Sequence, residues 1–111
     1  MMYVKMLACI FALSCSVMAN AANQGTGKVR ITFLENWVSG SGLYIKTDQS
    51  TKTNPAGCSN VSSYHLPSES SDLSRSILIS AYIAGKPVKL AIYGDGCSVN
   101  RPQIVAVGFE D

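Results

Sequence analysis

Few side chains in this sequence could carry acid–base or nucleophilic chemistry. His65, between Tyr64 and Leu66, is the only histidine. No serine lies in the Gly-x-Ser-x-Gly pattern that presents a nucleophile on a sharp strand-to-helix turn. Glu69 and Asp72 stand where a helix is expected to begin, and the helix dipole already explains carboxylates there. The sequence therefore predicts no catalytic residue, and a small enzyme or enzyme inhibitor would have to depend on His65.

Metal binding has as little support. One histidine and two widely spaced cysteines cannot complete a closed tetrahedral site. Asp95, between Gly94 and Gly96, is typical of a turn, and a calcium site would need several more carboxylates nearby. We predict no metal and no cofactor.

Aromatic side chains are the remaining candidates for a site. Trp37, Tyr44, Tyr64 and Tyr93 lie on or beside expected strands. A sugar can stack its CH faces on aromatic rings while its hydroxyl groups bond to neighbouring polar side chains. The alternative is that these rings only pack in the core or against a sheet.

The first twenty-one residues have the three parts of a secretory signal peptide. Lys5 precedes an apolar run from Met6 to Met18, and the small residues of 19–21 form a cleavage site. This run is too short for a bilayer, which takes about 20 residues, and no later run approaches that length. A lipoprotein leader modified at Cys15 is the alternative, although Ala12 stands where such leaders carry a branched residue. The sequence thus predicts a periplasmic or secreted protein with a signal peptide over 1–21.

Cleavage after Ala21 would remove Cys9 and Cys15 and leave Cys58 and Cys97. An oxidising compartment favours a disulfide between them over two buried free thiols. Closing so long a loop contributes roughly 4 kcal/mol in the chain-entropy model. This is a large contribution to a single small domain, 22–111, whose core is marginal.

The mature chain is nearly neutral. Lys and Arg number nine and Asp and Glu seven; removing Lys5 with the leader leaves a net charge of +1. The basic residues are scattered and form no stripe with aromatics, so a nucleic acid is not the expected partner.

Alternation of apolar and polar residues predicts most elements as strands. Val29, Ile31 and Phe33 are expected on the buried face of the first strand, with a bulge or bend near 34–36. A turn at 39–42 joins the first two strands in a hairpin. The expected strands cover 28–38, 43–47, 64–66, 88–93 and 103–109. Both faces of the last one are apolar, which predicts cover on both sides.

The other segments are expected to be loops and one helix. Residues 22–27 form a loose arm, 48–63 a long loop and 94–96 a turn. A helix is expected over 68–84, capped by Ser68 or Ser71, and ended by Gly85 and Pro87. Its expected apolar face comprises Leu73, Ile77, Ala81 and Ala84. The order predicts a mainly β chain with one helix (α+β), arranged as a small antiparallel sheet or partly open barrel with the helix across it.

Two segments resemble a known family. The stretch from Ile77 to Tyr93, with its helix ending in Gly85-Lys86-Pro87-Val88, is similar to that of the receptor-binding B subunit of subtilase cytotoxin and its pertussis-like relatives. The stretch from Thr26 to Thr32 resembles their Ser-Gly opening into the first strand. The segment from Asn54 to Cys58, together with Cys97, also resembles a group of small secreted proteobacterial proteins of unassigned role.

This resemblance implies an oligonucleotide/oligosaccharide-binding-type (OB-like) barrel, a pentameric assembly and glycan recognition. It places Thr26 where the family has a hydroxyl residue that contacts sialic acid. The expected ligand-binding residues are therefore Thr26, Trp37, Tyr44 and Tyr64. The expected function is a secreted, non-enzymatic glycan-binding module, and the alternative is a periplasmic structural or interaction protein without a sugar site.

Overall fold

Strands dominate the structure, a computed structural model that describes residues 22–109. The elements are β1 (Gln24–Val29), β2 (Ile31–Asn36), β3 (Leu43–Thr47), β4 (Tyr64–Leu66), α2 (Asp72–Ala84), β5 (Val88–Ser98) and β6 (Arg101–Phe109). The mainly β class with a single helix is thereby confirmed for this part of the chain. The predicted signal peptide, with its two cysteines, lies outside the described residues.

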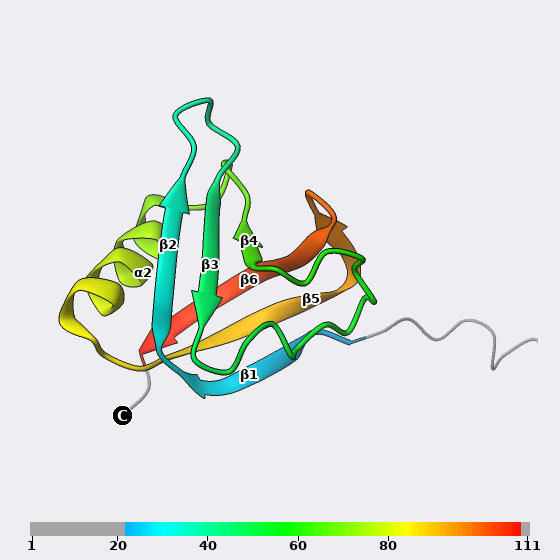
Figure 1. The fold of residues 1–111 in the computed structure, drawn as a ribbon, viewed down its shortest axis with the longest axis horizontal. Helices are drawn as coiled ribbons and strands as arrows, with labels where there is room; N and C mark the ends of the chain where they lie inside the picture. The colour runs from blue at the N-terminus through cyan, green and yellow to red at the C-terminus, as the bar shows by residue number, and fades with distance from the viewer. Residues whose placement is uncertain (1–21, 110–111) are drawn as a thin grey trace, which may run out of the picture.

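The strands form one curled sheet in the order β1-β5-β6-β4-β3-β2. Its two edge strands, β1 and β2, are consecutive segments that meet at Arg30 (Figure 1). Within residues 22–109 no ladder joins these edges, so the open sheet is the correct alternative and the closed barrel is not formed. All pairs are antiparallel except β4 with β6, where His65 lies beside Gln103. The sheet is thus antiparallel as predicted apart from this one pair, whose strands run the same way because two chain reversals, α2 and the β5–β6 hairpin, separate them.

The N-terminal segment is a strand and not the predicted loose arm. β1 pairs with β5 although its sequence is polar and rich in glycine. Backbone pairing suffices for an edge strand, and Thr26 fills the bulge between Gly25 and Lys28: its Oγ1 accepts from the Leu90 amide at 3.1 Å. The single strand expected over 28–38 is also divided, because the Arg30 amide bonds to the Asp48 carboxylate at 3.0 Å.

A bulge in β2 decides which side chains face the core. Ile31 pairs with Thr47 and Phe33 with Lys46, so Thr32 is the extra residue. The predicted position near 34–36 is wrong. The earlier bulge turns Phe33 to the outer face, contrary to the expected burial, and lets Leu34 pack against the core.

The β5–β6 hairpin turns later than predicted. β5 continues through residues 94–96 to Ser98, so the expected turn there is wrong. The chain reverses at Val99 and Asn100, whose φ values are 51° and 61°. Two consecutive positive φ angles define a two-residue loop that matches the twist of the flanking strands. The longer hairpin brings Cys97 opposite Pro102 and Ser98 opposite Arg101.

The core lies between the inner face of the sheet and α2, which packs against β2 and β6. Its buried apolar residues are Val29, Ile31, Leu43, Ile45, Tyr64, Leu66, Leu78, Ala81, Val88, Leu90, Ile92 and Ile104. In β6, Val105 and Ala106 are exposed, so the prediction that both faces of this strand are covered is wrong. The reason is that α2 covers the inner face alone.

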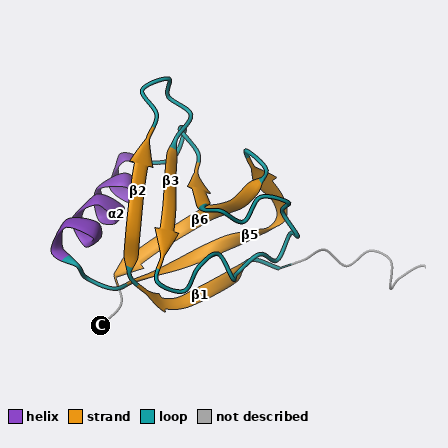
Figure 2. Cartoon of the chain, viewed as in Figure 1, coloured by secondary structure: helices purple, strands orange, loops and turns teal. Residues whose placement is uncertain are grey.

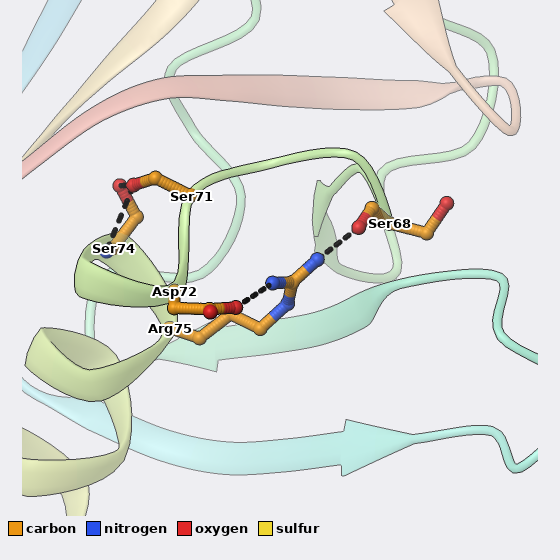
Figure 3. A network of polar contacts seen from close by, with 5 residues as sticks. All are labelled: Ser68, Ser71, Asp72, Ser74 and Arg75. Carbon is orange, nitrogen blue, oxygen red and sulfur yellow. Dashed lines mark hydrogen bonds and ion pairs between the residues drawn. The ribbon is translucent and has the colours of Figure 1, made fainter.

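Helix α2 begins at Asp72, later than the predicted Ser68. Ser71 is the cap: its Oγ accepts from the Ser74 amide at 3.2 Å (Figure 3). Arg75 bonds to the Asp72 carboxylate at 3.0 Å and donates to the Ser68 carbonyl, so the preceding turn is tied to the first helical turn. Gly85, with φ 66°, ends the helix as predicted, because glycine adopts this left-handed conformation without a Cβ clash.

The buried face of α2 is narrower than expected. Leu78 and Ala81 are its buried residues, whereas Leu73 and Ile83 are 70% and 78% exposed. The predicted face that included Leu73 and Ala84 is therefore wrong, because a helix laid across a curled sheet touches it along one stripe. Among the described residues no helix is both long and apolar enough to cross a membrane.

The predicted loop over 48–63 is confirmed as a segment without helix or strand (Figure 2). The predicted disulfide between Cys58 and Cys97 is present and ties this loop to the end of β5. Within the loop, the Asn54 side chain donates to the Cys58 carbonyl at 3.0 Å and accepts from the Cys58 amide at 2.8 Å. The loop is held by these specific bonds because it contributes little apolar surface to the core.

Candidate binding site on the β2–β3 hairpin

The β2–β3 hairpin presents a row of functional side chains on its outer face. Glu35 lies opposite Tyr44, and Phe33 lies opposite Lys46. Directly opposed residues of an antiparallel pair are close enough for their side chains to interact. The Thr32 bulge puts all four on one face, because without it Phe33 would point inward with Ile31.

These side chains line a pocket of about 220 Å³, which we call the hairpin pocket. Its lining comprises Phe33, Glu35, Trp37, Tyr44, Lys46, Ser62, Ser63 and Arg101. Three aromatic rings, two cations, one carboxylate and three hydroxyl groups, counting that of Tyr44, thus converge on a small space. Ligand sites characteristically combine apolar walls with a few placed polar groups.

Trp37 forms the exposed rim of the pocket. Its side chain is 58% exposed, and its indole N–H donates to the Glu35 carboxylate at 2.8 Å. This bond fixes the orientation of the ring. The turn that follows Trp37 is closed separately, by a bond from the Gly40 amide to the Trp37 carbonyl at 2.9 Å. Lys46 lies opposite Phe33 on the neighbouring strand β3, and its ammonium group is 4.8 Å from the centre of the Phe33 ring.

Arg101 closes the pocket from the β5–β6 side. Its guanidinium carbon lies 4.8 Å from the centre of the Tyr44 ring, which is cation–π geometry. Its Nε–H donates to Ser63 Oγ at 3.1 Å and its Nη1–H to the Val99 carbonyl at 3.1 Å. Arg101 therefore joins the 48–63 loop, the hairpin turn at Val99 and β3 around the pocket.

His65 lies beside Tyr44, as its direct partner on the neighbouring strand β4. The two rings are 4.8 Å apart between centroids, tilted by 55°, and His65 is only 2% exposed. Its Nε2 lies 2.7 Å from the Ser41 carbonyl oxygen, and its Nδ1 lies 2.6 Å from Ser98 Oγ. A carbonyl can only accept, so Nε2 carries the hydrogen and Nδ1 accepts from the Ser98 hydroxyl in the neutral ring.

Burial lowers the pKa of His65 below its ordinary value of 6.5, and the nearby Arg101 charge acts in the same direction. The bond to the Ser41 carbonyl and the charge of Glu69 oppose this shift without cancelling it. His65 is therefore neutral in the folded protein at neutral pH, with both ring nitrogens engaged.

The lowered pKa of His65 makes the free energy of unfolding depend on pH. Below pH 6.5 the unfolded chain binds a proton at His65 more readily than the folded chain does, so the free energy of unfolding falls as the pH drops. We expect the urea midpoint of the purified protein to fall between pH 7.5 and pH 5, and to fall less in a His65→Gln variant. Equal slopes for the two proteins over this interval would contradict the assignment of the effect to His65.

The structure places the four predicted binding residues in three different environments. Trp37 and Tyr44 are brought together in the hairpin pocket. Tyr64 is 2% exposed, points into the core and accepts from the Thr53 amide at 3.2 Å, so it supports the loop from inside. Thr26 lies on β1, away from the pocket lining, with its hydroxyl donating to the Gly27 carbonyl at 2.8 Å.

Sequence reasoning missed most of the polar lining. Glu35, Lys46, Ser62, Ser63 and Arg101 are not among the residues that the sequence predicts for the site. Alternation along 43–47 would have placed Lys46 on the Tyr44 face. No local signal marks Arg101, because its position depends on where the β5–β6 hairpin turns.

Two other hollows are less suited to a polar ligand. One, of about 320 Å³, lies between β6 and the start of α2, and includes Glu69, Ser71 and Val105 in its lining. Another of similar volume lies over β1, β5 and β6 near Gly25 and Val107. Neither brings an aromatic ring together with polar side chains. Within the described ranges there is also no cluster of three His, Cys, Asp or Glu side chains placed to hold a metal.

Comparison with known proteins gives no matching family model and no significantly similar curated protein.

Proposed function

We propose that this chain is a secreted, non-enzymatic binding module that takes the terminal unit of a glycan in the hairpin pocket. The observation that carries the proposal is the convergence of the exposed Trp37 ring and the Tyr44 ring with Glu35, Lys46 and Arg101. The rings offer faces for sugar CH groups, and the polar side chains offer donors and acceptors for hydroxyl groups. The pocket is smaller than the roughly 300–1,000 Å³ of sites for drug-sized ligands, which favours one sugar unit.

The position of His65 supports a binding role over catalysis. A general base must have a free nitrogen within reach of the proton that it takes. Both nitrogens of the buried His65 ring are held by Ser41 and Ser98. The predicted signal peptide and the disulfide fit a protein of the periplasm or the extracellular space.

A second function is favoured by one observation, the exposed apolar face of α2. Leu73, Ile79, Tyr82 and Ile83 are all at least 41% exposed. Such a face is typical of protein–protein contact. A periplasmic interaction protein without a sugar site is therefore the alternative, and the resemblance to pentameric toxin subunits makes a homo-oligomer the form to test by light scattering.

Replacement of Trp37 tests the glycan proposal. We expect the mature protein to bind members of a glycan array, and Trp37→Ala to weaken the best ligand about tenfold or more by calorimetry. The reason is that an aromatic contact contributes about 0.5–1.5 kcal/mol in addition to its buried area. Phe109→Ala, which removes a 49% exposed ring at the end of β6, is the matched control and should leave the affinity unchanged. The proposal is wrong if no glycan binds, or if both variants bind like the parent protein.

A further inference from the structure

The hairpin pocket is built from segments that lie far apart in the sequence: the β2–β3 hairpin, the end of the 48–63 loop and the start of β6. Trp37 belongs to the loop between β2 and β3, Arg101 belongs to the start of β6, and Tyr44 lies on β3 between them. The β2–β3 pairing holds Trp37 and Tyr44 in one hairpin, whereas Arg101 belongs to the separate β5–β6 hairpin. One buried side chain, His65, bonds to both hairpins.

His65 bonds to the loop that carries Trp37 and reaches Arg101 through Ser98. Its Nε2 donates to the Ser41 carbonyl at 2.7 Å, in the loop that carries Trp37. Its Nδ1 accepts from Ser98 Oγ at 2.6 Å, and Ser98 pairs directly with Arg101. Its ring packs on Tyr44, which also contacts the Arg101 guanidinium and donates from its hydroxyl to Ser41 Oγ at 3.4 Å.

We propose that His65 is the positioning residue of the hairpin pocket, and that in its neutral form it sets the separation between the Trp37 loop and the Arg101 strand end. The inference rests on the proposed function only in taking this pocket as the binding site. The coupling itself is a property of the protein without ligand, and so can be measured separately.

Protonation of His65 would place a second cation beside Arg101 in a nearly solvent-free position. The charged and polar groups that face the ring are Arg101 from β6, Glu69 from the turn before α2, Tyr44 from β3, Ser98 from β5 and Ser41 from the hairpin loop. Glu69 offsets part of the new charge, but Ser98 would have to reverse from donor to acceptor. Arg101 and the Ser41 loop are therefore expected to move when His65 takes up a proton.

Nuclear magnetic resonance of the uniformly ¹⁵N-labelled mature protein provides the test. The chain has one histidine and one tryptophan, so the imidazole and indole signals are unambiguous. The indole N–H of Trp37 and the Nε–H of Arg101 report on the two sides of the pocket. Between pH 7.5 and pH 5 we expect both signals to shift with the same midpoint as the His65 imidazole, below 6.5.

The variant His65→Gln separates positioning from mere presence of a side chain. A glutamine amide can still donate to the Ser41 carbonyl but does not titrate, so both reporter signals should stay near their neutral positions across the same pH range. His65→Leu, which keeps volume but removes both bonds, should displace both signals at every pH. Asn23→Ala is the matched control for a hydrogen-bonding residue outside the pocket lining, since its side chain accepts from the Gly94 amide at 2.9 Å, and it should titrate like the parent protein.

The proposal is overturned if the two reporter signals do not follow the imidazole titration, or if His65→Gln shows the same pH-dependent shifts as the parent protein. The parent titration decides the matter even if a variant fails to fold. A glycan that binds with equal affinity in the parent protein and in His65→Leu would leave the binding function intact and refute the positioning role. Reporter signals that follow His65 while no glycan binds would support the positioning role and refute the function.

Discussion

Loss of the Cys58–Cys97 disulfide is expected to lower the free energy of unfolding by about 4 kcal/mol. The bond closes a loop with a sequence separation of 39 residues, and in the chain-entropy model its main effect is to restrict the unfolded chain. The loss is comparable to the whole net stability of many small domains. Urea unfolding of Cys58→Ser/Cys97→Ser, and of the parent protein with and without reductant, measures it.

Removal of the Cys58–Cys97 disulfide is also expected to open the hairpin pocket. Ser62 and Ser63 of its lining follow Cys58 in a loop that has few other anchors: the Asn60 amide bonds to the Asn100 carbonyl at 3.0 Å, Thr53 bonds to Tyr64, and Arg101 donates to Ser63 Oγ at 3.1 Å. Two titratable thiols in the native parent protein, or an unchanged urea midpoint on reduction, would contradict the predicted role of this bond.

Gly42→Ala is expected to destabilise the protein by about 3 kcal/mol or more. A Cβ at this position would lie 2.3 Å from the Leu66 carbonyl oxygen and 2.9 Å from His65 Nε2. The first of these is a backbone atom of β4 and cannot move without disturbing the β3–β4 pairing. Overpacking of a buried site costs about 1–3 kcal/mol, and the positive φ of 106° adds a strain of about 1–3 kcal/mol.

Gly40→Ala is the matched control for this prediction. Gly40 also has a positive φ, 86°, but a Cβ there would meet no atom within 4 Å. The free energy of unfolding of Gly40→Ala should therefore fall by only about 1 kcal/mol, the cost of backbone strain alone. Urea unfolding of both variants measures the difference, and equal losses would show that the close approach to His65 and Leu66 does not limit residue 42.

The residues that line the hairpin pocket could be predicted only in part from the local sequence. Trp37 and Tyr44 could be chosen because aromatic residues beside a hairpin turn are visible in the sequence. Tyr64 is also an aromatic residue on a predicted strand, yet its side chain is buried in the core, and all three residues of β4 are buried. Arg101 carries no signal, because a register set by the β5–β6 turn brings it over Tyr44.

The sequence by itself determined the features whose causes are local. Gly85 was predicted to end the helix, and Ser71 was one of the two predicted caps, because a left-handed residue and a side-chain acceptor act on neighbouring carbonyls and amides. Alternation identified the β2–β3 hairpin, and a cysteine pair in a chain with a predicted export signal predicted the disulfide. The helix ends and the alternation depend on residues close together in the sequence, and the disulfide follows from the number of cysteines left after the predicted cleavage.

Only the tertiary structure decided the register and the pocket. The bulge at Thr32, the length of β5 and the break at Arg30 depend on which strands pair and on where distant groups such as Asp48 can satisfy the backbone. The burial of His65 depends on three segments converging on one ring. Such features are fixed by the free energy of the whole sheet, since a shift of one residue in register would turn Phe33 inward and dismantle the outer face of the hairpin.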